Sequence, residues 1–151
     1  MLTLGLGSYL LRRKHHPYAA NLTLAAGMIV VLLAAHEGLA QAILSAQTQN
    51  PRPDDLLLID GELTTGSSLL FYTRQPVHLV NGRVNGPWFG SFWPDAPPIF
   101  ETDQTLHALW QSPRRLFLLT GNPQPRTHDL AHYGPVHTLT FAGGKAILTN
   151  H

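Results

Sequence analysis

The sequence contains little charge and no cysteine. Only 13% of its 151 residues are Asp, Glu, Lys or Arg, about half the usual share for a soluble domain. The formal net charge of +1 excludes the strong positive field expected of a nucleic-acid-binding protein. The lack of cysteine excludes disulfides and thiolate metal sites. A chain of this length can form one domain with an anchor, and its low charge indicates that part of it lies in lipid.

A long uncharged stretch runs from Pro17 to Ala35 (PYAANLTLAAGMIVVLLAA). As a helix, these nineteen residues would extend about 28 Å, close to the hydrocarbon thickness of a bilayer. A basic cluster at residues 12–16 (RRKHH) precedes the stretch, and the first charge after it is Glu37. By the positive-inside rule, the cluster stays in the cytoplasm and the residues beyond 36 lie outside it. The sequence therefore predicts a transmembrane helix followed by an extracytoplasmic domain.

Two alternatives explain the same stretch. A secretory signal peptide would use Gly38-Leu39-Ala40 for cleavage, although an apolar segment before the basic cluster is unusual for a signal. The stretch also fits the buried helix of a soluble protein.

Residues 1–11 (MLTLGLGSYLL) are too short to span alone and are interpreted as the end of a truncated span. The predicted division is 1–16 for this end with a cytoplasmic loop, 17–50 for the transmembrane helix with an extracytoplasmic extension, and 51–151 for a small periplasmic domain.

Strand patterns alternate with helix patterns beyond residue 50. Three short apolar runs predict strands buried on both faces, and two stretches predict helices, the first with Ser and Thr available for capping. A terminal hairpin is predicted around Gly143-Gly144. The strands are expected at residues 54–60, 76–80 and 114–120, the helices at 64–73 and 101–111, and the hairpin at 135–141 and 145–150. The predicted fold class is α/β: an N-terminal transmembrane helix, then a small three-layer-like domain with a mostly parallel sheet and a C-terminal β-hairpin.

The segment from Asn81 to Phe100 (NGRVNGPWFGSFWPDAPPIF) is rich in aromatic residues and poor in charge. A twenty-residue connection in a compact domain is normally functional or disordered, and disordered segments are poor in aromatics. Aromatic side chains on such a loop fit a membrane interface, a sugar ring or a lipid chain. The alternative is that the aromatic side chains only cap the open end of the sheet. The residues concerned are Trp88, Phe89, Phe92 and Trp93.

Asp60-Gly61-Glu62 lies at the carboxyl end of the first predicted strand, where ligands bind in open α/β sheets. Two carboxylates there could act as acid and base or bind a cation. The alternative is a turn in which Asp60 caps the next helix. Arg114 and Arg115, at the start of the third strand, are expected to pair with Asp95 or Glu101, or to reach a phosphate.

Motifs for cofactors, metals and nucleophiles are weak. The sequence has no G-x-G-x-x-G or P-loop pattern, and Ser67-Ser68 has no nucleophile elbow around it. His128 and His132 are four residues apart, but no third ligand lies near them in sequence. We therefore predict no cofactor and no metal.

Two long segments, residues 60–100 and 106–120, together resemble the C-terminal end of bacterial family 39-type glycosyltransferases. These polytopic enzymes are similar to aminoarabinose lipid A transferases and protein mannosyltransferases. The resemblance covers about residues 20 to 120 and rests on the order and spacing of its features. These features are Asp60-Gly61-Glu62, Ser67-Ser68, Phe71-Tyr72, the Asn81–Asn85 turn, Trp88-Phe89-Gly90, Pro94-Asp95-Ala96-Pro97, Phe100, Trp110 and Arg114–Phe117.

The resemblance implies a transferase of the GT-C architecture at the inner membrane, with its C-terminal domain in the periplasm. Such an enzyme takes a sugar from a polyprenyl-phosphate donor and passes it to a lipid or glycan acceptor, so the implied partners include membrane lipid. In that family the catalytic acidic residue lies in the first extracytoplasmic loop, which this sequence does not contain. The resemblance therefore implies a C-terminal fragment, inactive alone and without a catalytic residue. The alternative is a single-span membrane protein whose exposed domain is a non-enzymatic module that binds a glycan or a partner.

The candidate binding residues would cover the active-site cavity or help to place the acceptor. One group offers apolar or stacking surface, and the other offers polar contacts. The first group is Tyr72, Trp88, Phe89 and Trp93, and the second is Asp60, Glu62, Asn81, Arg83 and Asp95.

Overall fold

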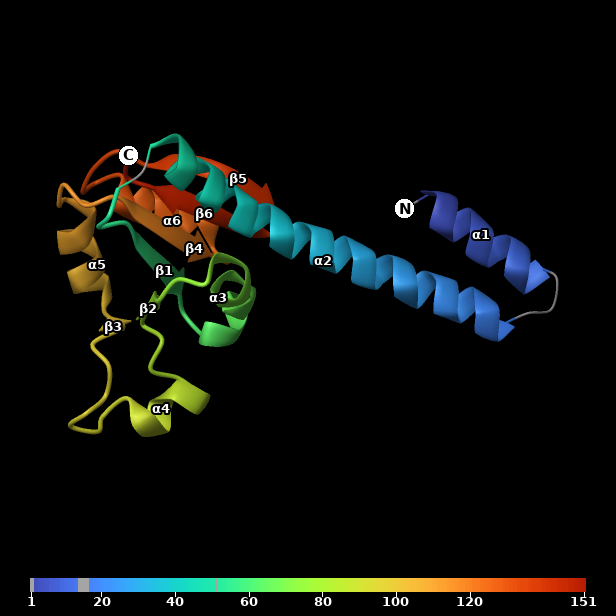
Figure 1. Cartoon of the computed structure of the whole chain (residues 1–151), viewed down its shortest axis with the longest axis horizontal. Helices are drawn as coiled ribbons and strands as arrows, with labels where there is room; N and C mark the ends of the chain where they lie inside the picture. The colour runs from blue at the N-terminus through green and yellow to red at the C-terminus, as the bar shows by residue number, and fades with distance from the viewer. Residues whose placement is uncertain (1, 14–16, 51) are drawn as a thin grey trace. The chain divides into compact units, whose positions relative to one another are not determined.

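The computed structural model describes residues 2–13, 17–50 and 52–151 (Figure 1). The chain divides into two compact units, Met1–His36 and Glu37–His151. Part of the predicted basic cluster, residues 14–16, lies outside the described residues, as does Pro51.

The N-terminal unit is helical. Helix α1 spans Leu2–Arg13, and helix α2 begins at Pro17. The hydroxyl of Ser8 donates a hydrogen bond to the carbonyl oxygen of Ala20 at 3.1 Å, and both residues are buried. The prediction that the first residues form helical turns is therefore confirmed from residue 2 onward.

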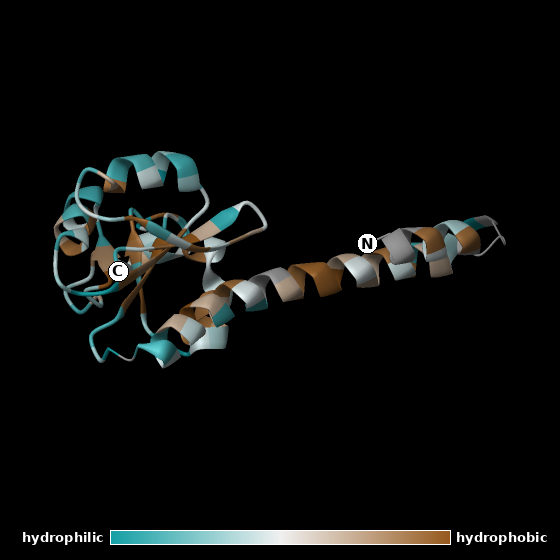
Figure 2. Cartoon of the chain, turned by 90° about the horizontal axis from the view of Figure 1, so that it is seen from above, coloured by the Kyte–Doolittle hydropathy of each residue, from teal (hydrophilic) through white to brown (hydrophobic). Residues whose placement is uncertain are grey.

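Helix α2 spans Pro17–Gln49 and is long and apolar enough to cross a membrane, judged by length and composition. The middle of the helix is strongly hydrophobic (Figure 2). Only 12% of its most apolar 18-residue window is buried, which disfavours the buried helix of a soluble protein. A signal peptide would meet the same criteria of length and composition. The predicted extension beyond residue 36 is confirmed, because the helix continues to Gln49.

The second unit is built on a six-stranded sheet with the strand order β3-β2-β1-β4-β6-β5. Neighbouring strands from β3 to β4 are parallel, whereas β6 runs antiparallel to both β4 and β5. The strands are β1 (Leu56–Asp60), β2 (Val77–Val80), β3 (Phe100–Glu101), β4 (Leu116–Thr120), β5 (His137–Ala142) and β6 (Lys145–Thr149). The hairpin turn places Gly143 and Gly144 at positive φ, 59° and 79°, where glycine is favoured.

Two apolar clusters, one on each face of the sheet, make the domain three-layered. On one face, Leu57 and Ile59 of β1 pack with Ile43 of α2 and Leu69 of α3 (Ser67–Thr73). On the other face, alternate residues of the same strands pack with Leu106 and Trp110 of α5 (Asp103–Trp110) and with Leu130 of α6 (Pro123–Leu130). The predicted α/β class is confirmed, with its three layers, mostly parallel sheet and C-terminal hairpin.

Several local features differ from the sequence prediction. A short 3-10 turn, η1 (Leu63–Thr65), precedes α3, and Gly66 is the N-cap residue of α3 with no side-chain capping bond, so the predicted Ser or Thr cap is wrong. Strand β3, helix α4 (Gly86–Gly90) and helix α6 were not predicted. The second predicted helix begins two residues later than expected, because Thr102 and Thr105 form a capping box at its start.

Candidate functional site

The carboxyl ends of β1 and β4 meet at a topological switch point. After β1 the chain passes to α3 on one face of the sheet, and after β4 it passes to α6 on the other. Asp60 ends β1 and Thr120 ends β4, and the Thr120 hydroxyl donates a hydrogen bond to Asp60 Oδ2 at 2.8 Å. Open α/β sheets bind ligands in this position, and Asp60 lies at the carboxyl end of β1 as predicted.

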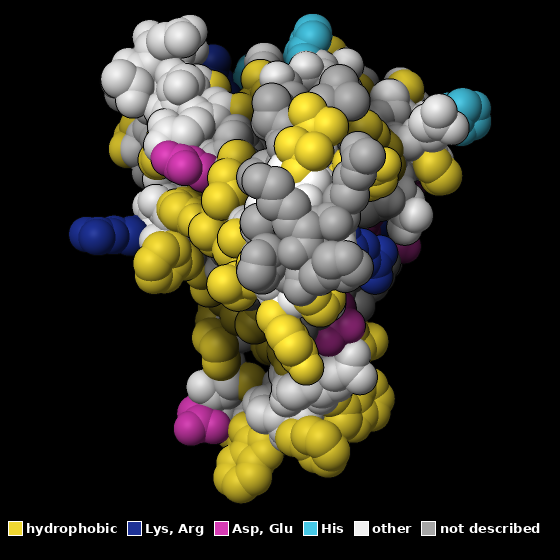
Figure 3. Space-filling model, turned by 90° about the vertical axis from the view of Figure 1, so that its right-hand side faces the viewer, with side chains coloured by type: hydrophobic (Ala, Val, Ile, Leu, Met, Phe, Trp, Pro, Cys, Tyr) yellow, Lys and Arg dark blue, Asp and Glu magenta, His cyan; other side chains and the backbone are white. Residues whose placement is uncertain are grey.

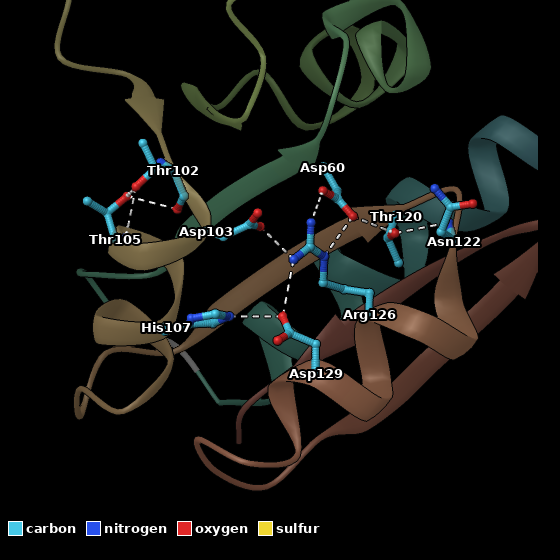
Figure 4. A network of polar contacts seen from close by, with 9 residues as sticks. All are labelled: Asp60, Thr102, Asp103, Thr105, His107, Thr120, Asn122, Arg126 and Asp129. Carbon is cyan, nitrogen blue, oxygen red and sulfur yellow. Dashed lines mark hydrogen bonds and ion pairs between the residues drawn. The ribbon is translucent and has the colours of Figure 1, made fainter.

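The guanidinium of Arg126 occupies the centre of this edge (Figure 4). Its Nη2 and Nε donate to the two carboxylate oxygens of Asp60 at 2.6 and 2.9 Å, a bidentate pair. Its Nη1 donates to Asp103 Oδ1 at 2.7 Å and to Asp129 Oδ2 at 3.2 Å. The side chains of Arg126 and Asp60 are only 14% and 12% exposed. We call this set, with Thr120 and His107, the Arg126 network.

His107 connects the network to the surface of α5. Its Nε2 lies 2.9 Å from Asp129 Oδ2, and its ring stacks on Tyr133 with centroids 3.9 Å apart. A cavity of about 460 Å³ opens beside the network, lined by Gly61, Asn122 and Pro125 as well as by network residues. With three carboxylates against one guanidinium, the cavity wall is acidic.

The electrostatics of the network follow from these contacts. Burial lowers the pKa of Arg126, but hydrogen bonds to Asp60 and Asp103 outweigh this effect and raise it above its usual value. Partial burial raises the pKa of Asp103, but hydrogen bonds from Arg126 and Asn81 hold it below normal. The hydrogen bond from His107 is the main cause that lowers the pKa of Asp129. Arg126 is therefore charged at neutral pH and is paired with the charged carboxylates of Asp103 and Asp129.

This pairing limits the chemistry that Asp60 can perform. Both of its carboxylate oxygens already accept hydrogen bonds from Arg126, and one also accepts from Thr120. A general base needs an oxygen that can reach the substrate's proton, so the geometry favours a structural brace that ties β1, α5 and α6 together. The alternative in which Asp60 caps the next helix is wrong, because its partners lie on β4 and α6.

The sequence reasoning missed Arg126, Asp129 and His107. Arg126 and Asp129 lie on α6, whose segment PQPRTHDL lacks an apolar periodicity. The available signal was Pro123 at the start of the helix, a favoured position for proline. Arg126 and Asp129, three residues apart, could then have been placed on one face.

The other predicted polar residues are dispersed. Asn81 follows β2 at positive φ, and its side chain helps to lower the pKa of Asp103, so it borders the network. Glu62 precedes η1 at the end of the β1 loop. Tyr72, on α3, packs partly buried against the apolar cluster on the opposite face from α5 and α6.

The remaining predicted residues gather on the connection between β2 and β3. We call residues 86–93, which form α4 and the turn after it, the aromatic segment. Its aromatic side chains are between 51% and 81% exposed, so the alternative that they cap the sheet is wrong. The exposed Arg83 packs against the segment, with its guanidinium carbon 4.9 Å from the Phe92 ring centroid, and Asp95 is exposed as well. The exposed aromatic residues are Trp88, Phe89, Phe92 and Trp93.

The partners predicted for Arg114 and Arg115 are wrong. Arg115 pairs with Asp55, with Nη2 and Oδ2 2.6 Å apart and both side chains 6% exposed. Arg114 donates to the backbone carbonyl of Asp54. Glu101 instead faces His78, with Oε1 and Nδ1 2.8 Å apart. Within residues 2–13, 17–50 and 52–151, no group of three His, Asp or Glu side chains is arranged to hold a metal ion.

Comparison with known proteins identifies a shared fold. No protein-family model and no curated protein matches the sequence. Two crystal structures of ArnT from Cupriavidus metallidurans match the structure, one bound to undecaprenyl phosphate and one in the apo state. Their TM-scores are 0.59 and 0.55, at 17% and 18% sequence identity. Each match covers 97% of this chain and 27% of that chain, so this chain spans about a quarter of the ArnT length. The resemblance to aminoarabinose-type transferases is thereby confirmed at the level of fold.

Proposed function

We propose that this chain provides the C-terminal, membrane-anchored part of a membrane glycosyltransferase that uses a polyprenyl-phosphate-linked sugar. The observation that carries the proposal is the fold match, which extends over 97% of the chain to an ArnT structure bound to undecaprenyl phosphate. A helix of spanning length directly before an α/β domain agrees with a protein that works on a lipid-linked substrate.

In this proposal the chain positions substrates and does not itself catalyse transfer. The matched part is 27% of ArnT, and the resemblance places the family's catalytic carboxylate in an early extracytoplasmic loop outside it. The Arg126 network uses its charges internally, which agrees with a structural role. The aromatic segment and its neighbours Arg83 and Asp95 are the exposed groups available to a lipid or glycan acceptor.

The function is tested by a domain exchange. ArnT from Cupriavidus metallidurans is expressed with its matched segment replaced by this chain, and membranes are assayed for sugar transfer from an undecaprenyl-phosphate-linked donor. The matched control is ArnT with the same segment deleted. We expect the exchange protein to restore transfer and both the deletion and this chain alone to show none. An exchange protein that accumulates in membranes yet transfers no more than the deletion would favour the non-enzymatic binding module.

The proposed location is the inner membrane, with residues beyond 36 on the extracytoplasmic side. The supporting observations are the basic residues before α2 and the acidic Glu37 after its apolar stretch. Alkaline phosphatase fused after His151 should be active, because that enzyme folds only outside the reducing cytoplasm. A green fluorescent protein fusion at the same residue is the matched control and should be dark when exported in an unfolded state. The reverse pattern would contradict the orientation.

A further inference from the structure

We infer that the aromatic segment is a membrane-contacting surface that lies in the headgroup region of the bilayer. Figure 3 shows hydrophobic side chains at the lower end of the domain, where Figure 1 places α4 apart from the sheet. Phe89 and Trp93 are 81% and 67% exposed. The inference goes beyond the proposed function, because it requires no sugar transfer.

The segment buries its hydroxyl side chain and exposes its aromatic rings. Ser91 is buried at 4% exposure, and its hydroxyl donates to the Trp88 carbonyl at 3.0 Å. Arg83 Nη1 donates to the Ser91 carbonyl at 3.1 Å. The guanidinium also lies over the rings of Phe92 and Phe100, at 4.9 and 5.0 Å from their centroids. These contacts hold the backbone of the segment while its aromatic rings stay exposed, an unusual arrangement for a surface that faces only water.

The composition of the segment favours a bilayer over a glycan. Between Pro87 and Ile99 the single formal charge is Asp95, and the single hydroxyl is the buried Ser91. A sugar site needs hydrogen-bonding side chains beside its stacking ring, and this surface offers few. Tryptophan and phenylalanine with few neighbouring charges suit the water–lipid interface, where the Asp95 carboxylate and the exposed Arg83 guanidinium can remain hydrated.

The covalent connection to α2 also keeps the domain close to a bilayer. The domain begins at Glu37, directly after the apolar stretch of α2, and is therefore tethered to any membrane that α2 crosses. A covalent tether of this kind raises the effective concentration of the lipid surface near the aromatic segment. Weak insertion of a few rings is then enough to hold the surface at the interface.

Tryptophan fluorescence of the full chain tests this inference. The sequence has three tryptophans: Trp88 and Trp93 are in the segment, and Trp110 is in the core at 2% exposure. The chain is reconstituted into phosphatidylcholine–phosphatidylglycerol vesicles whose acyl chains carry bromine near the headgroup. We expect several-fold stronger quenching of the wild-type emission than of the W88F/W93F variant, in which only Trp110 remains.

A matched pair of charge substitutions sharpens the test. Phe89→Asp should reduce the quenching, because a carboxylate at this position disfavours insertion. Phe141→Asp makes the same change at a 63% exposed phenylalanine on β5, at the opposite edge of the sheet from β3, and should leave the quenching unchanged. Both positions are exposed, and circular dichroism checks that both variants fold.

Each other outcome overturns the inference in a distinct way. Weak lipid quenching with strong quenching by aqueous iodide would place the segment in water. Weak quenching by both would show that protein covers it. Protein that fails to float with the vesicles would remove the anchor itself. None of these readings depends on transfer, so a failed domain exchange would leave this result standing.

Discussion

The Arg126 network and the aromatic segment depart from the usual distribution of residues in opposite ways. The network places charged side chains such as Asp60, 12% exposed, inside the domain, whereas the segment places Phe89, 81% exposed, outside it. Buried charges are normal only when paired, and the structure supplies the partner of Asp60 in Arg126. For the aromatic side chains the described residues supply few contacts, so their partner is expected outside the domain. The Arg126 network therefore serves the stability of the fold, whereas the aromatic segment is a surface for interaction with a partner.

The largest effect should come from breaking the network. Arg126→Met removes the only cation bonded to Asp60 in the described network and leaves a buried carboxylate unpaired. Breaking a buried ion pair in this way costs about 3–5 kcal/mol of folding stability. The free energy of unfolding is measured by urea titration in detergent, followed by Trp110 emission in a W88F/W93F background.

Three control variants distinguish the loss of the Arg126–Asp60 ion pair from the simple loss of a side chain. Arg74→Met alters an exposed arginine at the end of α3 and should change stability by less than about 0.5 kcal/mol. Phe89→Ser, in the aromatic segment, should be equally mild, which would confirm the contrast between the two regions. The double variant Asp60→Asn/Arg126→Met should recover part of the loss, because the unpaired charge is gone. Equal destabilisation by Arg126→Met and Arg74→Met would contradict a bracing role.

The sequence predicted the central strands well because burial on both faces leaves a continuous apolar run. Leu56 to Ile59 of β1 are each no more than 5% exposed, and the run DLLLID shows this directly. Helix α6 was missed because it buries only Leu130 and is fixed by tertiary ion pairs. Strand β3 has two residues and exists only through its pairing with β2.

The candidate site was predicted only in part, for a related reason. Asp60 was identified from its place at the end of a strand, which is a local pattern. Its partner Arg126 is 66 residues away, and only the packing of α6 brings the two together. The aromatic segment was recognised from composition alone, but its conformation includes contacts of Ser91 and Arg83 that no local pattern reveals.

A smaller effect should appear as acid sensitivity of the network. The pKa values of Asp103 and Asp129 are lowered in the folded state, so their contribution to stability is fully present above the unfolded value near 3.8. It is lost as the pH falls through the lower folded values, so the free energy of unfolding should decrease as the pH is lowered below about 5. Solvent screening keeps the effect below that of Arg126→Met, because these side chains are 51% and 37% exposed.

Urea unfolding at a series of pH values from 7 to 3 measures this effect. The free energy of unfolding should fall less steeply with decreasing pH in Arg126→Met than in the wild type. In the variant, Asp103 loses a main cause of its lowered pKa, while Asp129 keeps its bond to His107. Identical slopes in the two proteins would show that Arg126 does not control these carboxylates, and the network would then stabilise the fold by packing alone.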